Sequence, residues 1–254
     1  MTPEQAAAAA RPAVQELGGA FAECPKTLRR ARQLGLTGWA FYVTGWGGAL
    51  GDVGPETLSA ALGFIAPDAA REGWESARKV APPPEIAGHY LAECCRWGRE
   101  RLTGFAGIER LIAVAERVVL AADPAGLPLF AAWRAMPVPD AEPGARAAVL
   151  IRLLREHRIA AQLLAVRSAG LTPLEALLAG PEGAAGAIAY GWQPPFPPFE
   201  PLVRRRVWAD AITDRITGAA YRVLEASERI ELVSLLDEAV RELRMQTGEY
   251  PSAS

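Results

Sequence analysis

The chain has 254 residues and a formal net charge of −2, and 50% of its residues are hydrophobic while 22% are charged. This balance is ordinary for a globular protein that buries a large core in one or two domains. The small net charge excludes a protein whose whole surface attracts nucleic acid, so any contact with DNA must be local.

The N-terminal segment and the cysteines indicate the cellular compartment of the protein. The opening MTPEQAAAAARPAVQELGG has no cationic start followed by an apolar stretch, and no apolar run approaches the about 20 residues of a membrane span. Three cysteines, two of them adjacent at Cys94 and Cys95, do not form the even, spaced set of a secreted disulfide protein. We therefore expect a cytoplasmic protein that has no membrane partner.

Residues 42–54 read YVTGWGGALGDVG, like a buried strand that runs into a phosphate-binding loop. The glycines from Gly45 to Gly51 give G-x-G-x-x-x-G, one residue longer than a dinucleotide fingerprint, and no Lys followed by Ser or Thr completes a P-loop. The next helix starts at Pro55, too far from the glycines for its N–H groups to hold a phosphate. We interpret the segment as a flexible turn that lets Trp46 and the backbone pack closely, and we expect no nucleotide and no other cofactor.

Helical periodicity dominates the chain, because apolar residues recur at intervals of three and four. In chain order the clearest helical segments are residues 12–24, 55–66, 84–97, 107–122 and 144–166. Two stretches look β-like, WAFYVT at 39–44 and VWADAITDRIT at 207–217. The sequence therefore predicts a mainly α fold in which a small β-hairpin within 207–217 is the only substantial β-structure.

Proline and glycine clusters separate the helices, and one of them suggests a domain boundary. The stretch DAEPG precedes the longest helical segment, which we expect to open a second unit. We predict a helical, aromatic-rich region over residues 1–143 and a winged-helix-like region over residues 144–254.

The second region has the order of elements of a winged helix. A long helix ends near Ser168, a turn and a short helix follow within 170–180, a further helix covers 200–208, and the hairpin and a final helix complete the unit. In such a module the second short helix enters the major groove and the hairpin lies along the phosphate backbone. The arginines expected to face phosphates are Arg204, Arg205, Arg206 and Arg215. The alternative is a solvated helix face with ion pairs to Glu200 and Asp210.

Five segments also carry a resemblance to a known family. They are YVTGWGGALGDV, PLFAAWRAMPVP, LLREHRIAAQLLAV, AGLTPLEALL and RITGAAYRVLEASE. In this order the chain resembles, from about residue 38 to 240, a family of actinobacterial helix-turn-helix domain proteins of unclear function, some encoded in natural-product clusters of the everninomicin type. The resemblance implies a helical N-terminal region joined to a helix-turn-helix-like C-terminal one, and it does not by itself imply DNA binding.

The chain departs from the family pattern at chemically important positions. The glycine pattern G-R-x-G-x-L-G is matched at Gly45, Gly48, Leu50 and Gly51. Trp46 stands where that pattern has arginine. The pattern R-E-H-R-x-D-x-H is matched over residues 155–158, but Ala160 and Gln162 replace its acid and its second histidine. One histidine remains of a pair that could bind a metal or move a proton, so this chain is a diverged member.

Few residues offer catalytic or metal-binding chemistry. His157 is a candidate general acid or base because its ordinary pKa lies near neutrality and Arg155 and Arg158 could hold an anion beside it. Asp52 is a second candidate acid. His89 has Glu93 one turn away on a helix, but zinc sites usually require three or four ligands in recognisable pairs. We therefore expect no metal site.

Seven tryptophans are many for this length, and most lie in the first region. Such rings either fill a helical core or line a pocket for a flat apolar ligand. The residues proposed to line such a pocket are Tyr42, Trp46, His89, Arg155 and Glu156.

Two functions from different classes remain open. The first is a small-molecule-responsive binding protein or transcriptional regulator whose partners are a small apolar or aromatic ligand and DNA; a homodimer is compatible with it. The alternative is a cofactor-independent enzyme of specialised, natural-product metabolism in which His157 or Asp52 assists proton transfer. An open basic groove beside residues 200–216 would favour the first function, and an enclosed pocket reached by Trp46 and His157 would favour the second.

Overall fold

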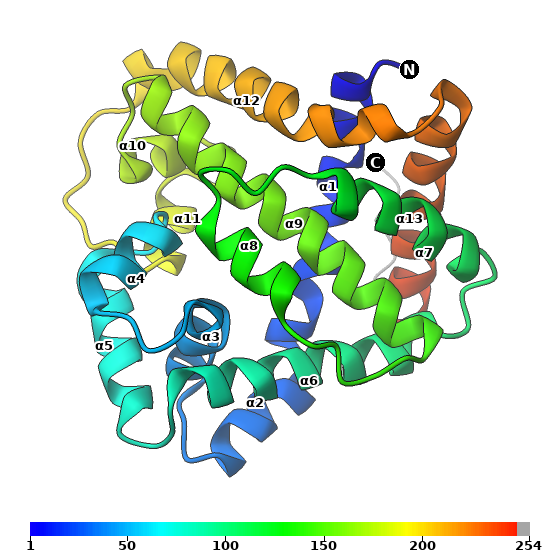
Figure 1. The fold of residues 1–254 in the computed structure, drawn as a ribbon. Coiled ribbons are helices and arrows are strands. Elements are labelled where there is room, and N and C mark those ends of the chain that lie inside the picture. Colours follow the sequence, from blue (N-terminus) through cyan, green and yellow to red (C-terminus); the bar gives the residue numbers. More distant parts are fainter. Residues whose placement is uncertain (248–254) are drawn as a thin grey trace.

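The computed structural model describes residues 1–247, and within them the chain forms thirteen α-helices, three short 3-10 helices and no strand (Figure 1). The α-helices are α1 (Pro3–Glu23), α2 (Pro25–Gln33), α3 (Gly38–Gly47), α4 (Pro55–Leu62), α5 (Pro67–Arg78), α6 (Pro83–Leu102), α7 (Ile108–Ala121), α8 (Pro128–Ala135), α9 (Pro143–Ser168), α10 (Pro173–Leu178), α11 (Gly183–Ala189), α12 (Val203–Gly218) and α13 (Ala226–Thr247). The 3-10 helices are η1 (Gly48–Leu50), η2 (Glu200–Leu202) and η3 (Ala219–Val223). The mainly α prediction is confirmed. No described helix has the length and apolarity needed to cross a membrane.

Helix α9 is the centre of the fold. It packs against α1, α6, α7, α8 and α12, and Figure 1 shows it crossing the middle of the molecule between α12 on one edge and α6 on the other. Because neighbours cover most of its circumference, apolar side chains lie on several faces and even charged residues are buried. The buried polar residues of α9 are Arg152, Glu156, His157 and Arg158. Buried charges are costly unless they are paired, so this helix concentrates the unusual chemistry of the chain.

Helix α1, near the N-terminus, contacts helices from the C-terminal part of the chain. It packs against α9, α12 and α13, and small side chains on its buried face permit a close approach. The main hydrophobic core extends from Ala6 to Leu243. The division between residues 143 and 144 stays a prediction, and α1 on one side of that boundary contacts three helices on the other.

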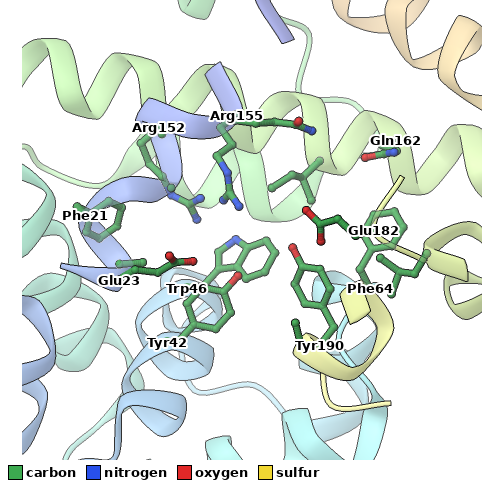
Figure 2. A pocket seen from close by; sticks show the side chains of 18 of the residues that line it. Phe21, Glu23, Tyr42, Trp46, Phe64, Arg152, Arg155, Gln162, Glu182 and Tyr190 are labelled. Atoms are coloured by element: carbon green, nitrogen blue, oxygen red, sulfur yellow. The ribbon is translucent and has the colours of Figure 1, made fainter. Parts of the chain in front are cut away.

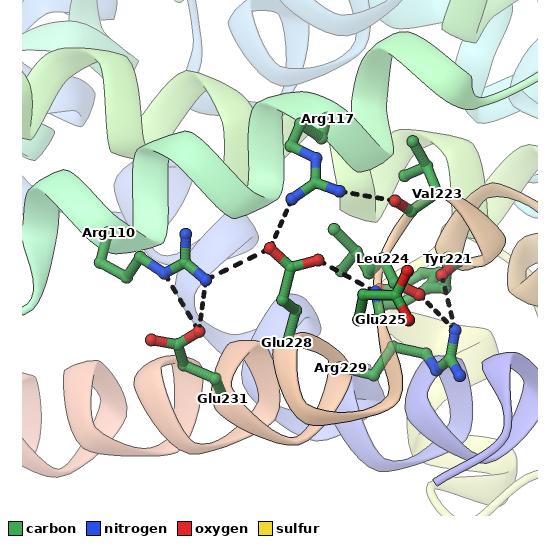
Figure 3. Close-up of polar contacts among 9 residues, drawn as sticks. All are labelled: Arg110, Arg117, Tyr221, Val223, Leu224, Glu225, Glu228, Arg229 and Glu231. Atoms are coloured by element: carbon green, nitrogen blue, oxygen red, sulfur yellow. Dashed lines mark hydrogen bonds and ion pairs between the residues drawn. The ribbon is translucent and has the colours of Figure 1, made fainter.

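A charged network attaches α13 to α7 (Figure 3). Arg110 donates to Glu231 at 2.7 Å, and Arg117 donates to Glu228 at 2.5 Å and to the Val223 carbonyl at 2.6 Å. Hydrogen bonds from the Glu225 backbone N–H and from Arg117 lower the pKa of Glu228 to about 2. Glu228 therefore stays ionised at neutral pH and holds the start of α13 in place.

The segment WAFYVT is helical, so the interpretation of this stretch as a strand was wrong. Thr37 caps α3 by accepting a hydrogen bond from the Ala40 backbone N–H at 3.0 Å. The helix is buried on most sides, and a short apolar run buried all round has no periodicity to distinguish helix from strand. A side chain at Gly45 would collide with Tyr90, and one at Gly48 would collide with the Pro83 carbonyl. These glycines form helical turns that bring α3 close to α6, so the close packing predicted around Trp46 is confirmed. The interpretation of the glycine segment as a turn was wrong, because it is helical up to Leu50.

The predicted β-hairpin within 207–217 was also wrong, because this segment belongs to α12. Ala209, Thr213 and Thr217 are buried at intervals of four residues, which is a helical stripe. The Thr213 hydroxyl donates to the Ala209 carbonyl and the Thr217 hydroxyl to the Thr213 carbonyl, both at 2.8 Å. The hydroxyls of these threonines, a residue type that usually favours strands, thus have hydrogen-bond partners within the helix. The described residues contain no wing.

The predicted turn between two helices after Ser168 is confirmed. Helix α9 ends at Ser168, and Gly170 has a φ of 70°, which a glycine adopts without strain. Thr172 then caps α10, with its side chain and that of Glu175 each accepting the other's backbone N–H. Residues 143–178 therefore form a helix, a glycine turn and a second, short helix.

Candidate ligand pocket

A cavity of about 740 Å³ lies beside α9 (Figure 2). Its walls come from α1, α3, α9, the segment around α11 and one residue of α12. The α9 wall consists of Arg152, Arg155, Ile159 and Gln162. Intervals of three and four residues place these four side chains on one face of the helix. Side chains far apart in the sequence thus converge on one cavity.

The opposite wall is aromatic. Trp39, Tyr42 and Trp46 project from successive turns of α3, and ring centroids are 5.9 Å apart for the first pair and 5.7 Å for the second. Tyr190, which follows α11, and Phe64, between α4 and α5, extend this surface. Burial raises the pKa of Tyr42 to about 12, so its hydroxyl is neutral and can donate or accept a hydrogen bond.

A buried ion pair supports the wall from behind. Glu156 Oε2 accepts hydrogen bonds from Trp46 Nε1 at 2.7 Å and from Arg152 Nη2 at 3.0 Å. Trp133 Nε1 donates to the Trp46 carbonyl at 2.9 Å, and the Arg152 guanidinium lies 5.0 Å from the Trp133 ring centroid. Burial raises the pKa of Glu156, while Arg152 and Trp46 oppose that rise. Glu156 therefore balances the charge of Arg152 and fixes the orientation of Trp46.

Arg155 has no such partner. Figure 2 shows its guanidinium pointing into the cavity, and no carboxylate of residues 1–247 lies within ion-pair distance of it. Its Nε atom is buried without a hydrogen-bond partner. The side chain runs across Gly18 and Gly19 of α1, where a Cβ at Gly18 would lie 3.0 Å from carbon atoms of Arg155. Two adjacent glycines thus make room for a positive charge that faces the pocket.

Three of the five predicted pocket residues line this cavity: Tyr42, Trp46 and Arg155. The other two do not. Glu156 lies behind the wall, and His89 lies at the partly exposed surface of α6, 3.4 Å from Arg30 and 3.9 Å from Glu85. His89 therefore lies outside the cavity.

The structure does not bring the candidate catalytic residues to the pocket. His157 follows Arg155 by two residues, which turns its side chain roughly 200° away around α9. It packs against Phe130, with ring centroids 4.9 Å apart, and burial lowers its pKa to about 4. Asp52 lies at the surface, 3.0 Å from Arg78. Both positions separate these groups from any ligand in the cavity.

The four arginines proposed to contact DNA have different environments. Arg204, Arg205 and Arg215 are exposed on α12. Arg206 is half-buried: it donates to Asp210 at 3.1 Å and to the Ala176 carbonyl of α10 at 2.5 Å, and it also lines the pocket. The alternative interpretation, an ion pair to Asp210, is confirmed for Arg206. This residue attaches α12 to α10.

Several pocket residues were not predicted from the sequence. Tyr190 and Glu182 come from the segment around α11, and Gly18 and Gly19 come from α1. The three- and four-residue spacing from Arg152 to Gln162 was the signal that could have identified the α9 wall. Among residues 1–247 no group of three or more His, Cys, Asp or Glu side chains has an arrangement that could hold a metal ion.

Comparison with known proteins adds one finding. The sequence model of the Helix-turn-helix family matches residues 7–196. This range includes most of α1, the aromatic wall, α9, α10 and α11, and it ends before α12 and its arginines. No curated protein and no solved structure matches the chain significantly.

Proposed function

We propose that this chain, which belongs to the helix-turn-helix family, is a DNA-binding regulator whose affinity for DNA responds to a small molecule held in the pocket. One observation carries the proposal: the pocket is built on the helix, glycine turn and second helix of residues 143–178, which we propose to be the helix-turn-helix element. Arg152 to Gln162 of α9 form one wall, and the segment that follows α10 forms another. A ligand would therefore contact both the first helix of this element and the chain that leaves the second.

Arg206 supplies a route from the pocket to the proposed DNA surface. Its guanidinium lines the cavity and bonds the Ala176 carbonyl of α10, while its own helix carries the exposed Arg204 and Arg205. A ligand shifts an equilibrium between two arrangements only if it binds one of them better. A ligand that favours one position of Arg206 would favour one position of α12 relative to α10.

The proposed DNA surface is a local basic cluster at the end of α9. Arg205 lies over the turn, because a Cβ built at Gly170 would be 4.0 Å from its Nη1. Arg167 is exposed and donates to the Leu171 carbonyl at 3.2 Å. Arg205 and Arg167 thus bring positive charge to the turn, and Arg204 is exposed next to Arg205 on α12, in a chain whose net charge of −2 requires DNA contacts to be local.

Exchanging Arg204 and Arg205 together for alanine is expected to weaken binding to any DNA duplex. The plot of log affinity against log salt should become shallower by about 1.8, because each phosphate contact contributes about 0.9 to the slope. Fluorescence anisotropy of a labelled duplex between about 50 and 200 mM salt measures both quantities.

The matched control is the double change Arg29→Ala and Arg32→Ala, which removes two exposed arginines from α2. We expect this control to keep the wild-type salt slope. Equal losses in the two double variants would place the DNA contacts elsewhere, and a wild-type protein that binds no duplex at about 50 mM salt would refute the proposed function.

The enzyme alternative depended on His157 or Asp52, and neither reaches the pocket. The regulator is therefore the function we propose.

A further inference from the structure

We infer that the pocket binds a flat aromatic carboxylate, with the carboxylate on Arg155 and the ring system against the aromatic side chains of α3. This inference rests on the proposed function for the pocket's role as an effector site. It concerns only the chemistry of the ligand, which is determined by charge, shape and orientation within the cavity.

The charges of the two pocket arginines differ in how they are balanced. Arg152 is paired with Glu156 at 3.0 Å, and both side chains are almost completely buried. Arg155, one turn further along, is not paired with any carboxylate of residues 1–247. Arginine stays protonated at every physiological pH, so the pocket wall carries a positive charge that has no carboxylate of residues 1–247 at ion-pair distance.

A carboxylate is the group that Arg155 lacks. A buried donor without a partner is costly, and the planar guanidinium can bind both oxygens of a carboxylate at once. The Nε atom of Arg155 is such an unsatisfied buried donor. The Gly18–Gly19 pair of α1 leaves room for this side chain, because a Cβ at Gly18 would lie 3.0 Å from its Cβ and Cδ atoms. The site is therefore built around the arginine.

The shape of the cavity indicates the rest of the ligand. Trp39, Tyr42 and Tyr190 are partly exposed and lie around the volume of about 740 Å³, which falls within the size of drug-like binding sites. Aromatic walls favour flat apolar rings, and the neutral Tyr42 hydroxyl adds a hydrogen-bonding group near Arg155. Two fused rings with one carboxylate match this combination.

The acidic residues at the rim set the orientation. Glu23 and Glu182 are exposed and line the cavity, and Figure 2 shows the Glu182 carboxylate beside the Tyr190 hydroxyl, on the other side of Arg155 from Arg152. A carboxylate placed near either residue would be repelled, whereas near Arg155 it is attracted. The ligand therefore enters with its anionic group directed toward α9.

The test compares 2-naphthoate with 2-naphthamide, which has the same shape without the charge, by isothermal titration calorimetry on the full chain. We expect the wild-type protein to bind 2-naphthoate saturably and to prefer it over the amide by roughly ten- to hundredfold, as for a hydrogen bond to a charged group. Arg155→Met should remove this preference, and Arg155→Lys should retain part of it because the charge remains. Glu182→Gln should increase the affinity for 2-naphthoate.

Arg146→Met is the control, since it removes an exposed arginine from the same helix and should leave the preference unchanged. Absence of binding by 2-naphthoate, equal affinities for the two compounds, or a preference that persists in Arg155→Met would each overturn the inference. If Arg155→Met does not fold, the wild-type preference and the Glu182→Gln variant still decide it. None of these measurements involves DNA, so a failure here is distinguishable from a failure of the regulator function.

Discussion

Replacing Glu156 with alanine is expected to lower the free energy of unfolding by about 3–5 kcal/mol, the usual cost of breaking a buried ion pair on one side. Glu156 accepts hydrogen bonds from Arg152 and Trp46, and both it and Arg152 are at most 2% exposed. Alanine would leave the Arg152 charge buried without a counter-ion and the Trp46 N–H without an acceptor. Urea unfolding followed by tryptophan fluorescence measures the loss.

Two variants make this result specific. Glu156→Gln keeps an acceptor for Trp46 and should cost less than the alanine variant. Glu238→Ala removes an exposed carboxylate that lies 3.9 Å from Arg241, and it should change stability by less than about 1 kcal/mol. A Glu156→Ala protein as stable as the Glu238→Ala protein would show that the buried pair does not support the pocket wall.

Acidification is expected to destabilise the protein through His157 by about 3 kcal/mol between pH 6.5 and pH 4. Burial and the nearby Arg134 lower the pKa of His157 from 6.5 to about 4, and each pKa unit corresponds to about 1.4 kcal/mol. In this pH range the unfolded chain binds a proton at His157 that the folded chain does not bind. The contribution of His157 to the free energy of unfolding is therefore fully present above pH 6.5, and it decreases as the pH falls toward 4.

The measurement is urea unfolding at pH 7 and pH 5, where His157 accounts for a difference of about 2 kcal/mol. Other groups also titrate here, so the quantity to compare is the pH dependence of wild type and of His157→Gln. The variant should lack this contribution, whereas His89→Gln, which changes a surface histidine, should retain it. Identical pH dependence in wild type and His157→Gln would contradict the buried, neutral histidine.

Helix boundaries with strong local signals were predictable from the sequence. Pro143 begins α9, and Gly170 and Thr172 define the turn before α10, since each residue type favours its position for a local reason. Helices α3 and α12 were wrongly predicted as β-structure. Their pattern of polar and apolar residues depends on which faces are buried, and burial is a property of the whole fold. A helix surrounded by neighbours loses the alternation of polar and apolar faces.

The candidate site was also only partly predictable, because local side-chain chemistry is visible in the sequence and the contacts between distant helices are not. Tyr42, Trp46 and Arg155 were identified as pocket residues from side-chain chemistry, but the sequence did not show that α1 and α11 complete the cavity. Two positions at which the chain departs from the helix-turn-helix pattern, Trp46 and Gln162, both line the pocket. Ala160 and Gln162 were interpreted as the loss of a reactive site, and of these two only Gln162 lines the pocket.

The affinity for a labelled DNA duplex in the presence and absence of saturating 2-naphthoate tests the central claim most directly. Fluorescence anisotropy at about 50 mM salt gives this affinity, and calorimetry on the same sample establishes that the pocket is occupied. A pocket built on the helix-turn-helix element predicts at least a fivefold change in duplex affinity, the lower end of typical allosteric coupling, with no change when 2-naphthamide replaces the acid. Duplex affinity that stays the same while 2-naphthoate occupies the pocket would contradict the account.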